Sequence, residues 1–134
     1  MSEPEEDDIR LMIDRNSPYI TADDLLDQDA PVTIVSVKGG TVVDPKSQKK
    51  ARKAIVVLKG WDKPFACNIT NARTIANVVG GFRASQWVGK RVTLYPTTCM
   101  NKGETVACIR VRPKAPDGPG IPQSALRQRT TGTV

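Results

Sequence analysis

The 134-residue sequence contains no histidine, and aromatic residues make up only 4% of it. Without an imidazole there is no Ser-His-Asp or Cys-His arrangement for nucleophilic catalysis, and a zinc site would lack its usual ligands. The three cysteines (Cys67, Cys99 and Cys108) are odd in number and form no CxxC pair. We therefore expect reduced thiols, no bound metal, no cofactor and a cytoplasmic protein.

Other signatures of catalysis and of membranes are also missing. The chain has no GxxxxGK[ST] phosphate-binding loop, and residues 30–134 contain only four acidic side chains, too scattered for a two-metal centre. We therefore expect a protein that is not an enzyme. No apolar run approaches the roughly 18 residues of a membrane span. The acidic start MSEPEEDDIRLM is unlike a secretory signal, so we expect no membrane partner.

Charge is distributed very unevenly along the chain. Residues 1–29 hold ten acidic side chains against two arginines, a net charge of −8, whereas residues 30–134 hold eighteen lysines and arginines against four acids, a net charge of +14. A basic body of this kind suits a polyanionic partner, because a bound anion would relieve its self-repulsion. Length and composition predict an acidic disordered arm (1–18), one folded domain (19–114) and a flexible tail (115–134).

Patterns of apolar and β-branched residues predict a mainly β protein. A helical pattern separates the third and fourth strands, and this position of the single helix is the connectivity of the OB-fold, a small, partly open Greek-key barrel. We therefore expect a five-stranded OB-fold-like barrel with flexible tails, although other five-stranded barrels fit the same strand count. The predicted strands span residues 32–37, 54–60, 65–69, 91–96 and 105–113, and residues 42–43 can continue the first of them beyond its glycine pair.

The helix is predicted from the segment TNARTIANVVGG (70–81). Its apolar residues recur at i, i+3, i+4 and i+7 from Ala72, which places them on one face. Thr70 or Asn68 can cap its start, and the glycine pair at its end supplies a C-terminal cap. A weaker signature, Thr21 three residues before Asp24, predicts one helical turn ahead of the first strand.

The segments NITNARTIANVVGG, WVGKRVTLYPTT and ACIRVRP resemble a family of small proteins found mainly in phages and prophages. Members have a similar asparagine-threonine-asparagine helix, a tryptophan-glycine-lysine strand start and an IRVR-like last strand, and the match covers roughly residues 30–113. The resemblance implies an OB-like fold and a link to phage DNA replication or recombination. It brings no established binding residue, and Cys67 and Ile69 depart from the family pattern before the helix.

The stretch KSQKKARK (46–53) places five cations before the second predicted strand. Such a run often forms only a solvent-exposed face, or it protects the edge of a strand from pairing with another chain. In an OB-fold, however, the loop between strands one and two and the loop between strands four and five (here 97–104) bind oligonucleotides. The second loop adds one lysine, and alternation in the neighbouring strands adds three arginines. The predicted phosphate-binding set is Lys46, Lys49, Lys50, Arg52, Lys53, Arg91, Lys102, Arg110 and Arg112.

Two aromatic residues complete the predicted site, as platforms on which bases stack. Trp61 lies in the turn GWDKP, where a core position is awkward, and Tyr95 faces the predicted basic side of its strand. Trp87 is instead expected to fill the core, together with Phe65 and Phe82.

These patterns predict a sequence-tolerant, single-stranded DNA-binding protein of phage type, linked to replication or recombination. The alternative is a protein-interaction module that recruits a host or phage partner through the barrel or an edge strand, without nucleic acid. The sequence does not separate DNA from RNA as the ligand. It also leaves open binding to replication or recombination proteins and assembly into a homo-oligomer.

Overall fold

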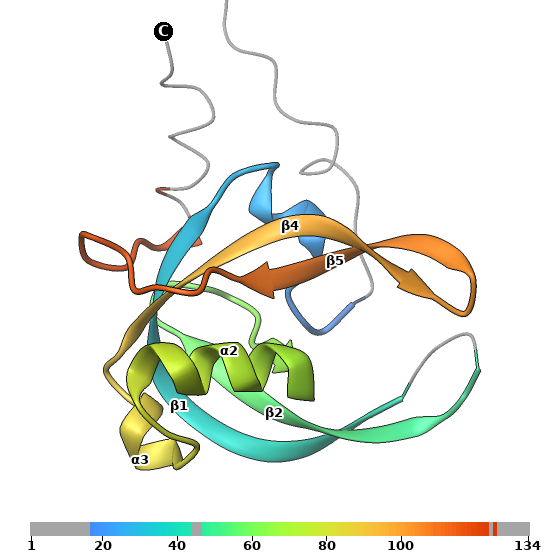
Figure 1. Cartoon of the computed structure of the whole chain (residues 1–134), viewed down its shortest axis with the longest axis horizontal. Helices are drawn as coiled ribbons and strands as arrows, with labels where there is room; N and C mark the ends of the chain where they lie inside the picture. Colours follow the sequence, from blue (N-terminus) through green and yellow to red (C-terminus); the bar gives the residue numbers. More distant parts are fainter. Residues whose placement is uncertain (1–16, 44–46, 124, 126–134) are drawn as a thin grey trace, which may run out of the picture.

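The computed structural model of the chain describes residues 17–43, 47–123 and 125. It is a mainly β structure, in which a five-stranded antiparallel sheet is interrupted by two helices between its third and fourth strands (Figure 1). In chain order the elements are the 3-10 turn η1 (Ala22–Leu25), β1 (Ala30–Val43), β2 (Lys50–Leu58), β3 (Phe65–Cys67), α2 (Ile69–Val79), α3 (Ala84–Trp87), β4 (Arg91–Asn101) and β5 (Glu104–Val111).

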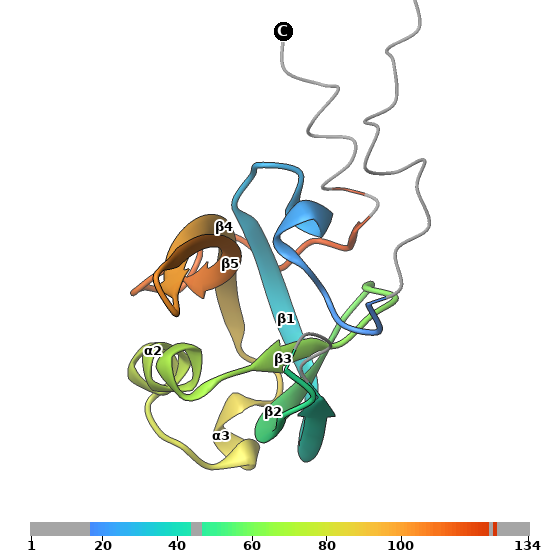
Figure 2. The same cartoon turned by 90° about the vertical axis from the view of Figure 1, so that its right-hand side faces the viewer.

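The strands are ordered β3-β2-β1-β4-β5, and each neighbouring pair is antiparallel. Strand β1 belongs to both halves of the sheet: residues 30–33 pair with β4, and residues 34–43 pair with β2. A register shift between Ile34 and Ser36 marks the change of partner, and a bulge of this kind increases the local twist. The sheet therefore curls, so that β4 and β5 lie on one side of the core and β2 and β3 on another (Figure 2).

The sheet is not closed into a barrel. Closure with this strand order would require pairing between the edge strands β3 and β5, and no ladder joins them in the described part of the chain. Helix α2 lies at this opening and contacts both edge strands. The predicted mainly β fold, with a helix after the third strand, is confirmed. The barrel and the OB-fold themselves are not shown.

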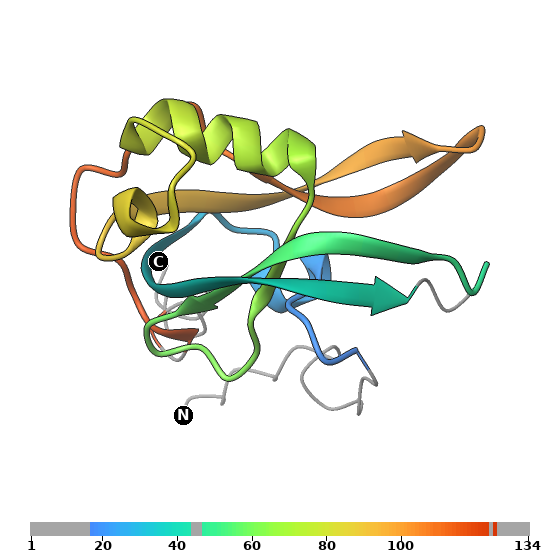
Figure 3. The same cartoon turned by 90° about the horizontal axis from the view of Figure 1, so that it is seen from below.

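Both hairpins are longer than the sequence pattern predicts. Strand β1 continues through its glycine pair to Val43, as predicted for residues 42–43, but β2 begins already at Lys50, so part of the basic stretch is strand rather than loop. The predicted loop 97–104 consists of two strand ends joined by Lys102 and Gly103, whose φ angles are 53° and 82°. Two positive φ angles are typical of a type I′ turn, whose twist matches that of a hairpin. The two hairpins project in the same direction (Figure 3).

The predicted helix is confirmed as α2, together with its caps. The Asn68 side-chain oxygen accepts a hydrogen bond from the Asn71 backbone N–H at 2.9 Å, and Gly80 ends the helix with φ of 101°. Ile75 and Ala76, from the predicted apolar face, are buried. Between this helix and β4 the sequence predicts only a tight link, whereas the structure forms the four-residue helix α3.

The two tryptophans both lie in the core. This confirms the prediction for Trp87, which is 3% exposed, and corrects the expected surface position of Trp61, which is 8% exposed. The indole Nε1 of Trp61 donates to the carbonyl oxygen of Ile121 at 3.1 Å. The Ile121 backbone N–H in turn donates to Pro31 O at 2.8 Å. The GWDKP turn can fold inward because the segment after β5 supplies a partner for the indole N–H.

The chain after β5 stays packed against the domain over more residues than its composition predicts. The Gln123 backbone N–H donates to Gly60 O at 3.1 Å. Gly120 lies so close to β1 that a Cβ at this position would be 2.5 Å from the Thr33 backbone nitrogen. The start of the predicted tail is therefore bound to the sheet, while most of the predicted arm and the rest of the tail lie outside the described residues.

Candidate nucleic-acid interface

The basic stretch lies on the β1–β2 hairpin. Lys50, Arg52 and Lys53 are residues of β2, and Lys49 directly precedes it. Because side chains alternate along a strand, Arg52 and Lys53 point to opposite faces. Lys49, Lys50 and Arg52 are exposed, and Lys53 is half-buried. Lys46 lies outside the described residues, so the structure gathers four of the five predicted cations on one hairpin.

A groove of about 400 Å³ lies between this hairpin and the segment that joins α2 to α3. Three cations of the hairpin line it: Lys38 from β1, and Arg52 and Lys53 from β2. Phe82 also lines the groove and is 66% exposed. None of the described residues that line the groove is acidic. The groove therefore combines positive charge with an accessible aromatic ring.

The guanidinium of Arg52 lies close to the backbone of β1 at this groove. A Cβ on Gly39 would be 2.5 Å from Arg52 Nη2, so the missing side chain is what permits the approach. Gly39 pairs with Ala54, which points to the same face of β2 as Arg52. The hairpin thus places this guanidinium at the wall of the groove.

Phe82 is the residue whose position the sequence reasoning missed. Its expected place in the core is incorrect because α2 ends at Gly80, and Phe82 then falls between the two helices, outside the apolar face. A signal for this position is present in the sequence. Phe82 follows two glycines and precedes Arg83, so no apolar periodicity connects it with the core.

Arg91 of β4 and Arg112, which directly follows β5, make contacts within the protein. Arg112 donates to both carboxylate oxygens of Asp29, at 3.1 and 2.9 Å, and these hydrogen bonds raise the pKa of Arg112. Its Cζ also lies 3.7 Å from the centroid of the Tyr95 ring. Arg91 donates to the carbonyl oxygen of Gly118 at 3.0 Å. These contacts occupy donors of two predicted phosphate ligands and one face of the predicted Tyr95 platform.

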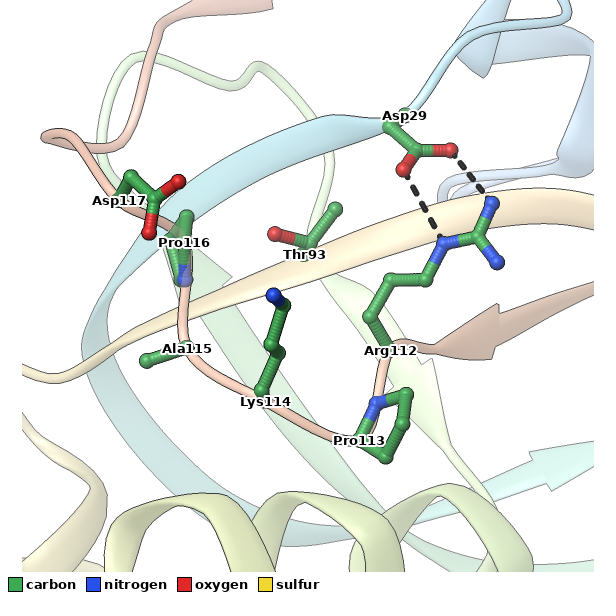
Figure 4. A pocket seen from close by; sticks show the side chains of 8 residues that line it. All are labelled: Asp29, Thr93, Arg112, Pro113, Lys114, Ala115, Pro116 and Asp117. Carbon is green, nitrogen blue, oxygen red and sulfur yellow. Dashed lines mark hydrogen bonds and ion pairs between the residues drawn. The ribbon is translucent and has the colours of Figure 1, made fainter.

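Figure 4 shows a pocket of about 360 Å³ beside the Asp29–Arg112 ion pair. Lys114 points into it, but Asp117 lines the same pocket as well as Asp29. A polyanion would meet two carboxylates here, with unfavourable electrostatic interactions. This pocket is therefore less suited to phosphates than the groove on the β1–β2 hairpin.

The other predicted cations lie elsewhere. Arg110 lines a pocket of about 250 Å³ at the opening between β3 and β5. Lys102 is exposed at the tip of the β4–β5 hairpin. The structure thus brings the predicted residues of β2 together, and it divides those of the β4–β5 hairpin and the residue after it among separate pockets and internal contacts.

Two thiols have altered acidity. Burial raises the pKa of the Cys67 thiol to about 12, against an opposing effect of Lys53. Burial and a hydrogen bond with Cys99 raise the pKa of the Cys108 thiol to about 11, opposed by Arg110. Both groups are protonated at neutral pH, and a protonated thiol is a poor nucleophile.

No protein-family model matches this chain, and neither a curated protein nor a solved structure matches it. The resemblance to small phage proteins therefore stays a prediction. None of the helices in the described part of the chain combines the length and the apolar character that a bilayer span requires. Within the same residues, no three His, Cys, Asp or Glu side chains are grouped in a way that could hold a metal ion.

Proposed function

We propose that this protein binds single-stranded DNA, with little sequence preference, through the basic surface of the β1–β2 hairpin. The observation that supports the proposal best is the charge of this hairpin. Between residues 30 and 58 the sequence has six lysines and arginines and one acid, Asp44. Lysine and arginine on an exposed surface bind phosphates, and such contacts carry no information about base sequence.

The aromatic ring beside the basic hairpin favours a single strand over a duplex. Phe82 is exposed in the groove that the hairpin cations line, and a base can stack on such a ring only when it is unpaired. Helix α2 carries a single cation, Arg73, so it offers little charge for binding in the major groove. A role in the replication or recombination of phage DNA, together with partner proteins, is part of the same proposal and derives from the sequence resemblance.

A titration with single-stranded and double-stranded oligonucleotides at several salt concentrations tests the proposal. If about five phosphates are neutralised, the logarithm of the association constant should fall with the logarithm of salt concentration at a slope of about −3 to −4 for a single strand. A slope near zero, or equal affinity for polyglutamate, would exclude nucleic-acid binding by this surface. An RNA oligonucleotide of the same base sequence decides between the two nucleic acids.

A protein-interaction module is the second candidate, and the open edges of the sheet favour it. Strands β3 and β5 are not paired with each other, so either edge offers main-chain groups to an extended peptide. Binding of this kind depends on main-chain hydrogen bonds and apolar contacts. It would therefore show a shallow dependence on salt and no preference for an oligonucleotide.

A further inference from the structure

We propose that the groove between the β1–β2 hairpin and the α2–α3 segment is a nucleobase subsite, in which Phe82 stacks on one unpaired base. Arg52 holds a phosphate that flanks this base, and Lys38 and Lys53, which also line the groove, add positive charge around it. The inference rests on the proposed binding of single strands, and it adds the residue that contacts the base. No aromatic residue predicted as a platform from the sequence has this position.

The exposure of Phe82 is the first observation. Its side chain is 66% exposed, whereas Trp87, five residues later on the same groove, is 3% exposed. Phe65 is also buried, at 3%. A phenyl ring has no polar group that would favour its exposure to water. Its exposed face is available for stacking. Every base has a π-face, so such a platform accepts all four bases.

The space beside the ring is the second observation. The groove has a volume of about 400 Å³, and several residues that line it have small side chains or none. Gly39 and Ala54 contribute from the hairpin, and Ala72 and Ala84 contribute from the two helices. Larger side chains at these positions would fill the groove. A flat ring can enter here, whereas a base in a duplex is covered by its neighbours.

The charge around the ring is the third observation. Three cations and no acid line this groove. The pocket beside Arg112 is lined by Asp29 and Asp117, and the pocket under η1 is lined by Asp23 and Asp27. The pocket between β3 and β5 has one arginine, and its aromatic residue, Phe65, is buried. These pockets all lie in the described residues. Among them, the groove on the β1–β2 hairpin is the one that combines an exposed aromatic ring with several cations.

The test is the binding of an eight-nucleotide oligothymidylate to the full chain and its variants. Phe82→Ala should weaken binding by about five- to 150-fold, the range that corresponds to loss of one base–aromatic stack. The salt slope should stay unchanged, because no charge is removed. Phe82→Tyr should keep the parent affinity, and Phe82→Leu should lose as much as Phe82→Ala, because leucine is apolar but has no π-face.

Ile69→Ala is the matched control, since Ile69 is also exposed (61%) but does not line the groove. Its affinity should equal that of the parent. If Phe82→Ala and Phe82→Leu bind as Ile69→Ala does, while loss of the hairpin lysines still weakens binding, the base subsite is overturned and the proposed function stands. If the parent shows no salt-dependent binding of the oligonucleotide, the proposed function and the subsite are overturned together.

Discussion

The side chain of Asn71 and the backbone of Ile109 are joined by a hydrogen bond of 2.9 Å, from Asn71 Nδ2 to the carbonyl oxygen. The bond spans the opening between the edge strands, because Asn71 lies on the first turn of α2 and Ile109 on β5. Nδ2 rather than Oδ1 must face the carbonyl, since two oxygens would repel each other. Oδ1 is buried and has no hydrogen-bond partner among the described residues. A helix side chain thus satisfies a main-chain acceptor that a fifth ladder, between β3 and β5, would otherwise pair.

Asn71→Ala should lower the free energy of unfolding by about 1–3 kcal/mol, because the carbonyl oxygen of Ile109 loses its donor inside the protein. Urea denaturation followed by circular dichroism measures the change. Thr70→Ala is the control, since Thr70 is the preceding residue of the same helix and is exposed. Equal stability of the two variants would show that the bond across the opening contributes nothing.

Trp61→Ala and Trp87→Ala should each lower the free energy of unfolding by about 3–5 kcal/mol, because both indoles fill the core and both N–H groups donate to carbonyl oxygens. Thermal and urea denaturation provide the measurement. Phe82→Ala, at an exposed aromatic residue, should unfold close to the parent. A Trp61→Ala protein that keeps its stability but no longer binds oligonucleotide would restore Trp61 as a platform for bases.

Replacement of Lys49, Lys50 and Lys53 by alanine should reduce the salt slope of single-strand binding by about 2, because each phosphate contact contributes about 0.7 to the slope. The loss should be similar for all base sequences. The control removes the same charge from exposed lysines outside the basic stretch: Lys59, Lys90 and Lys114. If both triple variants lose the same affinity, the effect is one of net charge and the hairpin has no special role.

Gly39→Ala should weaken binding without removing a charge. Its methyl group would lie 2.5 Å from Arg52 Nη2, so the guanidinium must leave its position at the groove. We expect a loss no larger than that of Arg52→Ala, and a reduction of the salt slope no larger than the roughly 0.7 of one phosphate contact. In a double-mutant cycle, Gly39→Ala should have no further effect once Arg52 is replaced. Full additivity of the two substitutions would contradict the proposed role of the Arg52 position.

The thiol of Cys67 should make stability sensitive to alkaline pH. Its pKa in the folded protein, about 12, is above the ordinary value of 9.0, so the folded state holds the proton more tightly than the unfolded chain does. This contribution is complete below pH 9.0 and is lost as pH rises toward 12. Iodoacetamide at pH 8 should label Cys67 only in urea, as measured by peptide mass spectrometry. Rapid labelling of Cys67 in the folded protein would contradict its burial.

Local patterns were sufficient for part of the fold. Helix α2 could be predicted because its cap residue, its apolar face and its terminal glycine are neighbours in the chain. The hairpin lengths could not, because Lys50 and Arg52 sit in a charged stretch without the apolar alternation that indicates a strand. Pairing with the opposite strand makes these residues extended, and that pairing depends on residues about ten positions away in β1.

The clustering of cations around the second strand was determined by the sequence itself, because residues that follow one another along a chain stay together in any fold. Which aromatic residues are exposed was decided only by the tertiary structure. Trp61 is buried because Ile121, 60 residues later, supplies the acceptor for its indole N–H. Arg112 is turned to Asp29, 83 residues earlier, and so covers the ring of Tyr95. Phe82 remains largely in solvent, because no distant segment in the described part of the chain covers it. Burial is a property of what surrounds a side chain, and most of those surroundings come from remote parts of the chain.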